Sequence, residues 1–130
     1  MAVDKSMPIL IVDDYKTMLK IVRNLLSQLG FNNVDEATDG TMALQKLQNP
    51  EKTFKLIISD WNMEPMSGLE LLKQVRVDER YKAVPFIMVT AESKPENVII
   101  AKKAGVNNYI IKPFNAQTLK DKLTAVLGPI

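Results

Sequence analysis

The chain has 130 residues, of which 46% are hydrophobic and 25% charged, and its 17 basic and 15 acidic side chains leave a net charge of +2. These values are typical of one globular domain, and so small a net charge does not favour nucleic-acid binding. Because the sequence contains neither cysteine nor histidine, disulfides, thiol catalysis, Ser-His nucleophiles and most transition-metal sites are excluded. Any chemistry must come from Asp, Glu, Lys, Ser, Thr, Tyr or a hard cation.

No apolar segment approaches the ~18 residues that a membrane span requires. The first residues, MAVDKSMP, lack the apolar core of a secretory signal. We therefore expect a cytoplasmic, monomeric protein without a membrane or nucleic-acid partner, with residues 1–130 forming one domain.

Short apolar runs alternate along the chain with longer segments in which apolar residues recur at helical spacing. The first run, ILIV at 9–12, is typical of a strand buried on both faces. Strands are expected at 9–12, 34–37, 56–59, 85–89 and 109–111. Helices are expected at 15–29, 41–47, 68–76, 93–104 and 116–127, the second of them with Met42, Ala43 and Leu47 turned inward.

Cap residues support the boundaries of these helices. Gly30 and Gly105 follow the first and fourth helices, where glycine commonly ends a helix. Ser93 and Glu96 have capping-box spacing at the start of the fourth helix, and Asn115 precedes the fifth. The pattern therefore consists of five strands, each followed by a helix.

Strands that alternate with helices predict an α/β fold, in which helices cover both faces of a parallel sheet. Right-handed crossovers limit the topology to a doubly wound sheet. Ligands bind such sheets at the carboxyl ends of the strands, near the point where the strand order reverses. Polar residues directly after the strands are therefore the first candidates for a functional site.

Polar residues follow four of the five strands: Asp13 and Asp14, then Asp60, Thr90 and Lys112. Each alone is typical of an ordinary turn, but this fold would bring them to one edge of the sheet. Two carboxylates about 4 Å apart repel by roughly 4 kcal/mol at an effective dielectric of 20, so three of them require protons or a cation. Oxygen-only ligands favour Mg²⁺ or Ca²⁺ over softer metals, and a site with few carboxylates and room for water suits Mg²⁺. A carboxylate beside Mg²⁺ with Lys and Thr donors predicts a phosphoryl site.

These residues resemble the response-regulator receiver domain of two-component signalling. The segments that match are ILIVDDYKTMLKIVRNLL, GFNNVDEATDGTMAL, SDWNM, GLELLKQVR, VTAES and YIIKPF, and the resemblance covers roughly residues 8–127. DWNM together with Tyr109 is similar to the single-domain chemotaxis receivers in particular. The resemblance implies a five-stranded, flavodoxin-like sheet of order 2-1-3-4-5 with five helices.

The resemblance also implies roles for the matching residues. Asp60 would accept a phosphoryl group from a phosphohistidine on a partner histidine kinase. Lys112 and Thr90 would contact the phosphoryl oxygens, and Tyr109 would be an aromatic switch residue that changes exposure as Thr90 moves.

Mg²⁺ would be held by Asp14, Asp60 and the backbone carbonyl of Asn62, with Asp13 acting through water. Asn62 and Glu92 occupy positions that tune how fast the acyl phosphate hydrolyses. The chain would not be an enzyme beyond its own phosphoryl transfer and autodephosphorylation.

The biology implied is chemotaxis, with output to a flagellar motor switch protein through the fourth helix, fifth strand and fifth helix. A phosphatase partner is left open. The alternative is a phosphate sink or phosphorelay carrier that binds no motor protein. A flavodoxin-like nucleotide binder fits poorly, because DDYK after the first strand would repel phosphate without a metal. An aspartate-nucleophile phosphohydrolase would place its nucleophile after the first strand.

The loop after Asp60 departs from the family pattern. Where receivers read Met-Pro-x-Met-Asp-Gly, this chain reads MEPMSG at 63–68, so Glu64 adds a carboxylate near the expected metal. We expect Trp61 to be partly exposed near the site, and the resemblance implies a cis Lys112–Pro113 bond. The connection at 49–55 is longer than its counterpart in the family.

Overall fold

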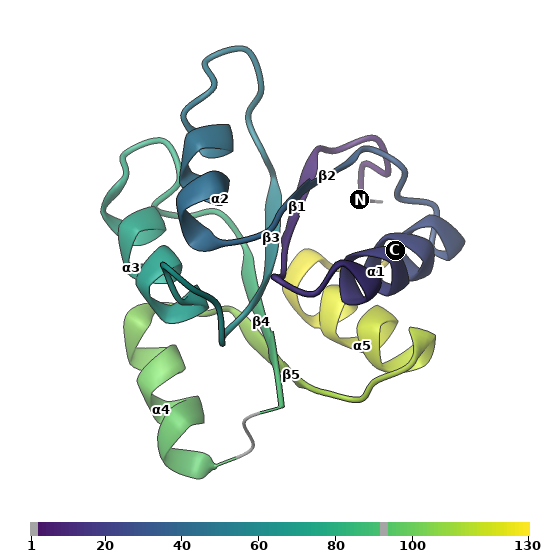
Figure 1. Ribbon diagram of the computed structural model, residues 1–130. Helices are drawn as coiled ribbons and strands as arrows, with labels where there is room; N and C mark the ends of the chain where they lie inside the picture. Colours follow the sequence, from purple (N-terminus) through teal and green to yellow (C-terminus); the bar gives the residue numbers. More distant parts are fainter. Residues whose placement is uncertain (1–2, 92–93) are drawn as a thin grey trace.

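Five parallel strands form one sheet in the computed structural model, which describes residues 3–91 and 94–130 (Figure 1). The strands are β1 (Ile9–Val12), β2 (Val34–Ala37), β3 (Leu56–Asp60), β4 (Phe86–Thr90) and β5 (Asn108–Ile111). Their order is β2-β1-β3-β4-β5, which confirms the doubly wound, flavodoxin-like α/β fold. The helices are α1 (Lys16–Gln28), α2 (Gly40–Leu47), α3 (Gly68–Val77), α4 (Pro95–Ala104) and α5 (Ala116–Leu127).

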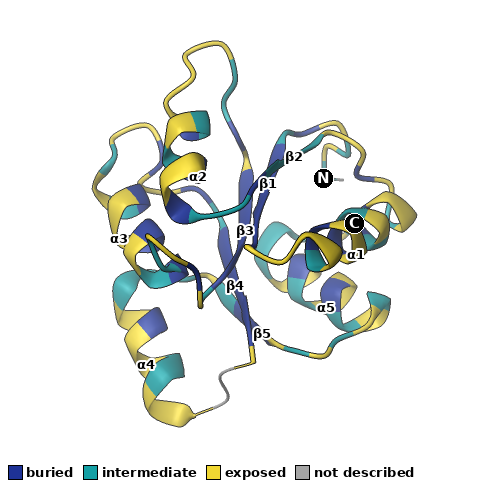
Figure 2. Cartoon of the chain, in the orientation of Figure 1, coloured by how far each residue is buried: buried dark blue, intermediate teal, exposed yellow. Residues whose placement is uncertain are grey.

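The helices cover both faces of the sheet, α1 and α5 on one side and α2, α3 and α4 on the other (Figure 1). Alternate residues of a strand point to opposite faces, so each strand supplies two cores. Leu10 and Ile57 belong to the cluster under α2 and α3, whereas Ile9 and Ile58 pack with residues of α1 and α5. All four are essentially inaccessible, as the dark blue strands of Figure 2 show. The central strands β1 and β3 are therefore buried on both faces, as the apolar run at 9–12 predicted.

The predicted boundaries agree with the structure to within one or two residues. Gly30 and Gly105 both have positive φ angles, 97° and 102°, and directly follow or end their helices. Asn115 caps α5, its side chain accepting a hydrogen bond from the backbone N–H of Thr118. Helix α4 begins at Pro95 with Lys94 at the N-cap position. The capping role predicted for Ser93 lies outside the described residues.

One orientation within α2 was predicted wrongly. Met42 is exposed, and the Thr38 hydroxyl lies 3.6 Å from its sulfur, whereas Ala43 and Leu47 are buried as expected. An eight-residue helix has room for few inward positions, and packing of α2 on β1 and β2 selects Gly40, Ala43 and Leu47. Helical spacing alone could not distinguish this face from its neighbour.

Arg80 holds the long connection between α2 and β3 at the edge of the sheet opposite the predicted site. Its guanidinium donates hydrogen bonds to the carbonyls of Leu47, Asn49 and Lys52 at 3.0, 2.7 and 2.7 Å and to the Thr53 hydroxyl at 2.8 Å. Five donors in a planar fork suit arginine to such a task. The Tyr81 hydroxyl also accepts from the Phe54 N–H at 3.3 Å, so two neighbouring side chains from beyond α3 order the connection at 49–55.

No helix in residues 3–91 or 94–130 combines the length and apolar character needed to cross a membrane.

Candidate functional site

The strand ends bring the predicted polar residues together at one edge of the sheet. β1 lies between β2 and β3, so Asp13 and Asp14, which follow it, stand beside Asp60 at the end of β3. Asp60 is in register with Val89, which places Thr90 one residue further along β4. Lys112 follows β5, and its backbone N–H donates to the Thr90 carbonyl at 2.8 Å. The site therefore forms from four segments distant in sequence.

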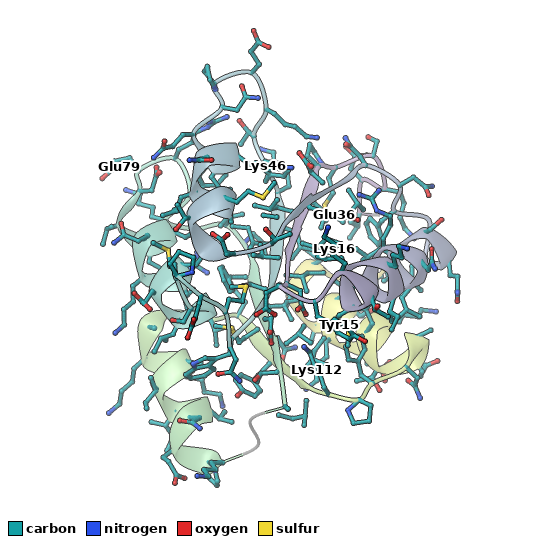
Figure 3. All side chains as sticks on the ribbon, viewed as in Figure 1. Tyr15, Lys16, Glu36, Lys46, Glu79 and Lys112 are labelled. Atoms are coloured by element: carbon teal, nitrogen blue, oxygen red, sulfur yellow. The ribbon has the colours of Figure 1, made fainter. Side chains whose placement is uncertain are left out.

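Lys112 bridges two of the carboxylates. Its ammonium lies 3.2 Å from an oxygen of Asp13 and 3.3 Å from an oxygen of Asp60, and all three side chains are largely buried. Figure 3 shows Lys112 at the same edge as Tyr15, whose backbone N–H donates to the other Asp13 oxygen at 2.9 Å. Charge-assisted bonds of this kind hold both carboxylates in fixed orientations.

Burial makes ionisation of these carboxyl groups costly. Desolvation raises the pKa of Asp60 above its ordinary value, and the neighbouring Asp13 charge adds to the rise. Desolvation also raises the pKa of Asp13, with a smaller contribution from Asp14. Lys112 opposes both shifts without cancelling them, so the site retains a demand for more positive charge.

The oxygens of this cluster fit a hard divalent cation. Carboxylate oxygens of Asp13, Asp14 and Asp60 lie within 4.8 Å of one another. Asp14 is exposed, and its carboxylate forms no hydrogen bond or ion pair with the residues at 3–91 and 94–130. Oxygen donors with room for water are what Mg²⁺ requires. Together with one carbonyl of the loop after β3, these residues could hold such an ion.

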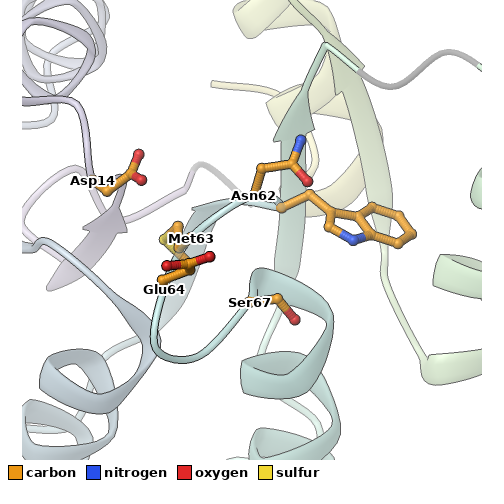
Figure 4. A pocket seen from close by; sticks show the side chains of 6 residues that line it. Asp14, Asn62, Met63, Glu64 and Ser67 are labelled. Carbon is orange, nitrogen blue, oxygen red and sulfur yellow. The ribbon is translucent and has the colours of Figure 1, made fainter.

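An open cleft of about 410 Å³ lies next to the cluster. It is lined by residues of the loop after β3 and by one residue that follows β1, shown in Figure 4: Asp14, Trp61, Asn62, Met63, Glu64 and Ser67. Through this cleft a donor molecule could approach Asp60 from solvent.

The two aromatic residues singled out in the sequence contact each other. Trp61 is half-buried, as expected, and Tyr109 is 9% exposed. Their rings meet edge to face, with centroids 6.2 Å apart and planes at 73°. Thr90, by contrast, is completely buried. Tyr109 therefore contacts Trp61, which lines the cleft, without lining the cleft itself.

A family model described as the response regulator receiver domain matches residues 9–124. The chain belongs to this family. Among curated relatives of the receiver, chemotaxis protein CheY-3 of Vibrio cholerae is 53% identical over 95% of this chain and 93% of its own length. Chemotaxis protein CheY of Pseudomonas aeruginosa is 52% identical over 92% of this chain and 95% of its own. The relation to chemotaxis receivers is thus confirmed at the level of sequence.

Solved structures agree with this assignment. The chemotaxis response regulator CheY4 of Vibrio cholerae superposes with a TM-score of 0.85 at 38% identity, covering 94% of this chain and 99% of that one. The receiver domain of a sensor histidine kinase from Pseudomonas aeruginosa has a TM-score of 0.83 at 25% identity, covering 95% of this chain and 98% of its own. That domain is described with a magnesium ion coordinated in its active-site cleft.

Most of the predicted site residues of this receiver lie where the strand-end argument placed them. Asp13, Asp14, Asp60 and Lys112 form the charged cluster, with Thr90 at the neighbouring strand end. Asn62 lines the cleft, and its side chain is exposed. The hydrolysis-tuning role predicted for Glu92 falls outside the described residues. The cis geometry implied for Lys112–Pro113 is present, and Glu64–Pro65 is also cis.

Two residues that support Asp60 were not predicted. A side chain at Gly68 would collide with the carbonyl oxygen of Asp60, so α3 can begin this close to β3 only with glycine there. The buried Ser59 hydroxyl donates to the same carbonyl oxygen at 2.9 Å. A glycine at a helix start eight residues after the acid was the one available signal in the sequence.

Proposed function

We propose that this receiver is a chemotaxis response regulator that accepts a phosphoryl group on Asp60. The observation that carries the proposal is the placement of a buried Asp60 carboxylate 3.3 Å from the Lys112 ammonium, beside an open acidic cleft. Its chemotaxis relatives, more than half identical over nearly the whole chain, support the biological context.

The transfer is a displacement at phosphorus. An Asp60 oxygen attacks the phosphorus of a phosphohistidine, the new O–P bond forms as the N–P bond breaks, and the imidazole leaves with a proton taken from solvent. The donor must lie on another molecule, since this chain has no histidine. The Lys112 ammonium can offset the phosphoryl charge from its position between Asp13 and Asp60.

Mg²⁺ fits the same chemistry. Asp14, Asp60 and the Asn62 backbone carbonyl would hold it, with Asp13 acting through water. When bound, the cation neutralises charge on the phosphoryl oxygens. The magnesium described in the Pseudomonas aeruginosa receiver supports this assignment. The protein would catalyse only its own phosphorylation and dephosphorylation, and is in that sense not an enzyme.

Output would pass from the site to a flagellar motor switch protein. Thr90 ends the strand next to Asp60, and Tyr109 lies on β5, in register with Met88 of β4. A shift of Thr90 towards a phosphoryl group would change the space open to Tyr109, and with it the surface of α4, β5 and α5. The Trp61–Tyr109 ring contact links this surface back to the site.

Mass spectrometry tests the phosphoacceptor directly. Incubation of the chain with acetyl phosphate and Mg²⁺ should add one phosphoryl group to the wild type and none to Asp60→Asn. An Asp60→Asn chain that gained the group as the wild type does would refute the assignment. Peptide mapping after borohydride reduction then locates the modified residue.

A binding experiment separates the motor regulator from the phosphate sink. An amino-terminal peptide of a flagellar motor switch protein is titrated into the chain with and without beryllofluoride, an acyl-phosphate mimic. Tighter binding in the presence of the mimic supports the regulator. Equal binding in both states would favour a sink or relay that passes its phosphoryl group on.

A further inference from the structure

The cleft beside Asp60 contains a carboxylate, Glu64, that the phosphoryl chemistry leaves without a role. Figure 4 shows that Glu64 and Asp14 line the cleft from two separate segments, the loop after β3 and the end of β1. In the family pattern the position of Glu64 belongs to a proline. The charge is therefore a feature of this chain rather than of receivers in general.

The loop on both sides of Glu64 is held in place. Before it, Met63 is 6% exposed and packs in the core under α2 and α3. After it, Met66 packs so closely on Gly40 of α2 that a Cβ there would lie 2.7 Å from the Met66 side chain. The Gly68 N–H donates to the Trp61 carbonyl at 2.8 Å and closes the loop. Glu64 thus projects from a short arch with fixed ends.

The charge of Glu64 is not compensated by protein. Its exposed carboxylate has no ion pair or side-chain hydrogen bond with the residues described at 3–91 and 94–130, and Asp14 opposite it has none either. Lys112 neutralises Asp13 and Asp60 instead. Uncompensated negative charge therefore faces the cleft from both walls.

The cleft is large enough for a hydrated cation. Its volume is about 410 Å³, and a water molecule takes up roughly 30 Å³. Mg²⁺ gives up its water reluctantly and usually keeps several of these ligands in proteins. A carboxylate on the far wall of such a cleft can accept hydrogen bonds from the retained water without touching the metal.

We propose that Glu64 is an outer-sphere ligand of the divalent cation at this site. Its carboxylate accepts hydrogen bonds from cation-bound water across the cleft from Asp14 and increases the affinity of the receiver for Mg²⁺. The inference rests on the proposed Mg²⁺ site and adds a residue to it. Because the charge acts through water, both its sign and its position on the wall matter.

Titration calorimetry with Mg²⁺ alone tests this proposal, using the full chain without phosphodonor. Glu64→Gln should weaken Mg²⁺ binding about three- to tenfold, and Glu64→Lys should weaken it further, as expected for a charge one water layer from a divalent ion. Glu51→Gln and Glu51→Lys make the same changes in net charge in the exposed loop at 49–55, and should stay within about twofold of the wild type. Trp61 emission provides a second measure of the same affinities.

The outcomes separate this inference from the proposed function. If the wild type binds Mg²⁺ and both Glu64 variants bind it equally well, the role of Glu64 is refuted while the metal site stands. If the Glu51 variants lose as much affinity, net charge rather than position is responsible, and the inference is again refuted. A wild type that binds no Mg²⁺ overturns both. Far-UV circular dichroism in EDTA verifies that every variant is folded.

Discussion

Asp14→Asn should stabilise the metal-free protein, because the Asp14 carboxylate is repelled by the other two carboxylates of the cluster and forms no ion pair with Lys112. Its carboxylate has oxygen neighbours of Asp13 and Asp60 within 4.8 Å, whereas Lys112 contacts only those two. Each repulsive pair at 4.8 Å is worth about 0.9 kcal/mol at the dielectric of water and about 3.5 kcal/mol at an effective value of 20. Asp14 is exposed, so the lower figure applies, and salt screening reduces it further. Removing both pairs should add about 1–2 kcal/mol to the free energy of unfolding.

Mg²⁺ should reverse this order of stability. A cation that binds only the folded wild type adds about 1.4 kcal/mol at ten times its dissociation constant and about 2.7 kcal/mol at a hundred times. Because Asp14→Asn loses a ligand for the cation, the order should reverse at the higher concentration. Urea denaturation followed by far-UV circular dichroism, in EDTA and in Mg²⁺, measures both effects. Glu51→Gln removes one negative charge from a distant exposed loop and should change neither. The reasoning is refuted if Asp14→Asn is no more stable than the wild type in EDTA, or if Mg²⁺ stabilises the two chains equally.

Three further predictions concern Asp60 and the contacts around the fold. Burial raises the pKa of Asp60 in the folded protein above its value in the unfolded chain. The contribution of Asp60 to the free energy of unfolding is therefore fully present below the unfolded pKa and is lost as the pH rises through the folded pKa. The stability of Asp60→Asn relative to wild type, measured by urea denaturation in EDTA, should therefore grow as the pH rises above about 4, the ordinary pKa of an aspartate, and a constant difference would contradict the shift. Arg80→Ala removes four hydrogen bonds to the connection at 47–53 and should cost about 2 kcal/mol, measured by thermal denaturation. Lys82→Ala, which removes only an exposed ion pair 3.0 Å long, should cost under about 1 kcal/mol, and equal losses would argue against the Arg80 contacts. Gly68→Ala should cost about 1–3 kcal/mol and slow phosphorylation by acetyl phosphate, because the added methyl group displaces the Asp60 carbonyl. Unchanged stability and rate would show that α3 can move away freely.

Local patterns in the sequence were sufficient for the elements and for their ends. The run at 9–12 is apolar at every position because helices cover both faces of β1. A strand buried on both faces can therefore be recognised from its residue types alone. Gly30 and Gly105 stop their helices through positive φ angles that other residues rarely adopt, so they too could be read without a structure. The strand-end rule then identified Asp13, Asp60 and Lys112 as neighbours.

The strand order came from the resemblance to receivers, since alternation of strands and helices is compatible with several orders. Only the tertiary structure shows which carboxylates Lys112 meets, at 3.2 and 3.3 Å, because Asp13 and Asp60 lie 99 and 52 residues away along the chain. The same holds for Met42, whose outward orientation depends on how α2 seats against the sheet.

In the loop after Asp60, the position of the Glu64 side chain could not be predicted from the sequence. The sequence determined that Glu64 adds a carboxylate near the site, but not where that carboxylate points. Its place in the lining of the cleft that Asp14 also lines follows from the burial of Met63, the packing of Met66 on Gly40 and the closure by Gly68. These contacts join segments that are remote in sequence, so their energies depend on the assembled fold. The sequence by itself therefore determined which chemical groups gather at the sheet edge, and the tertiary structure decided which of them face one another.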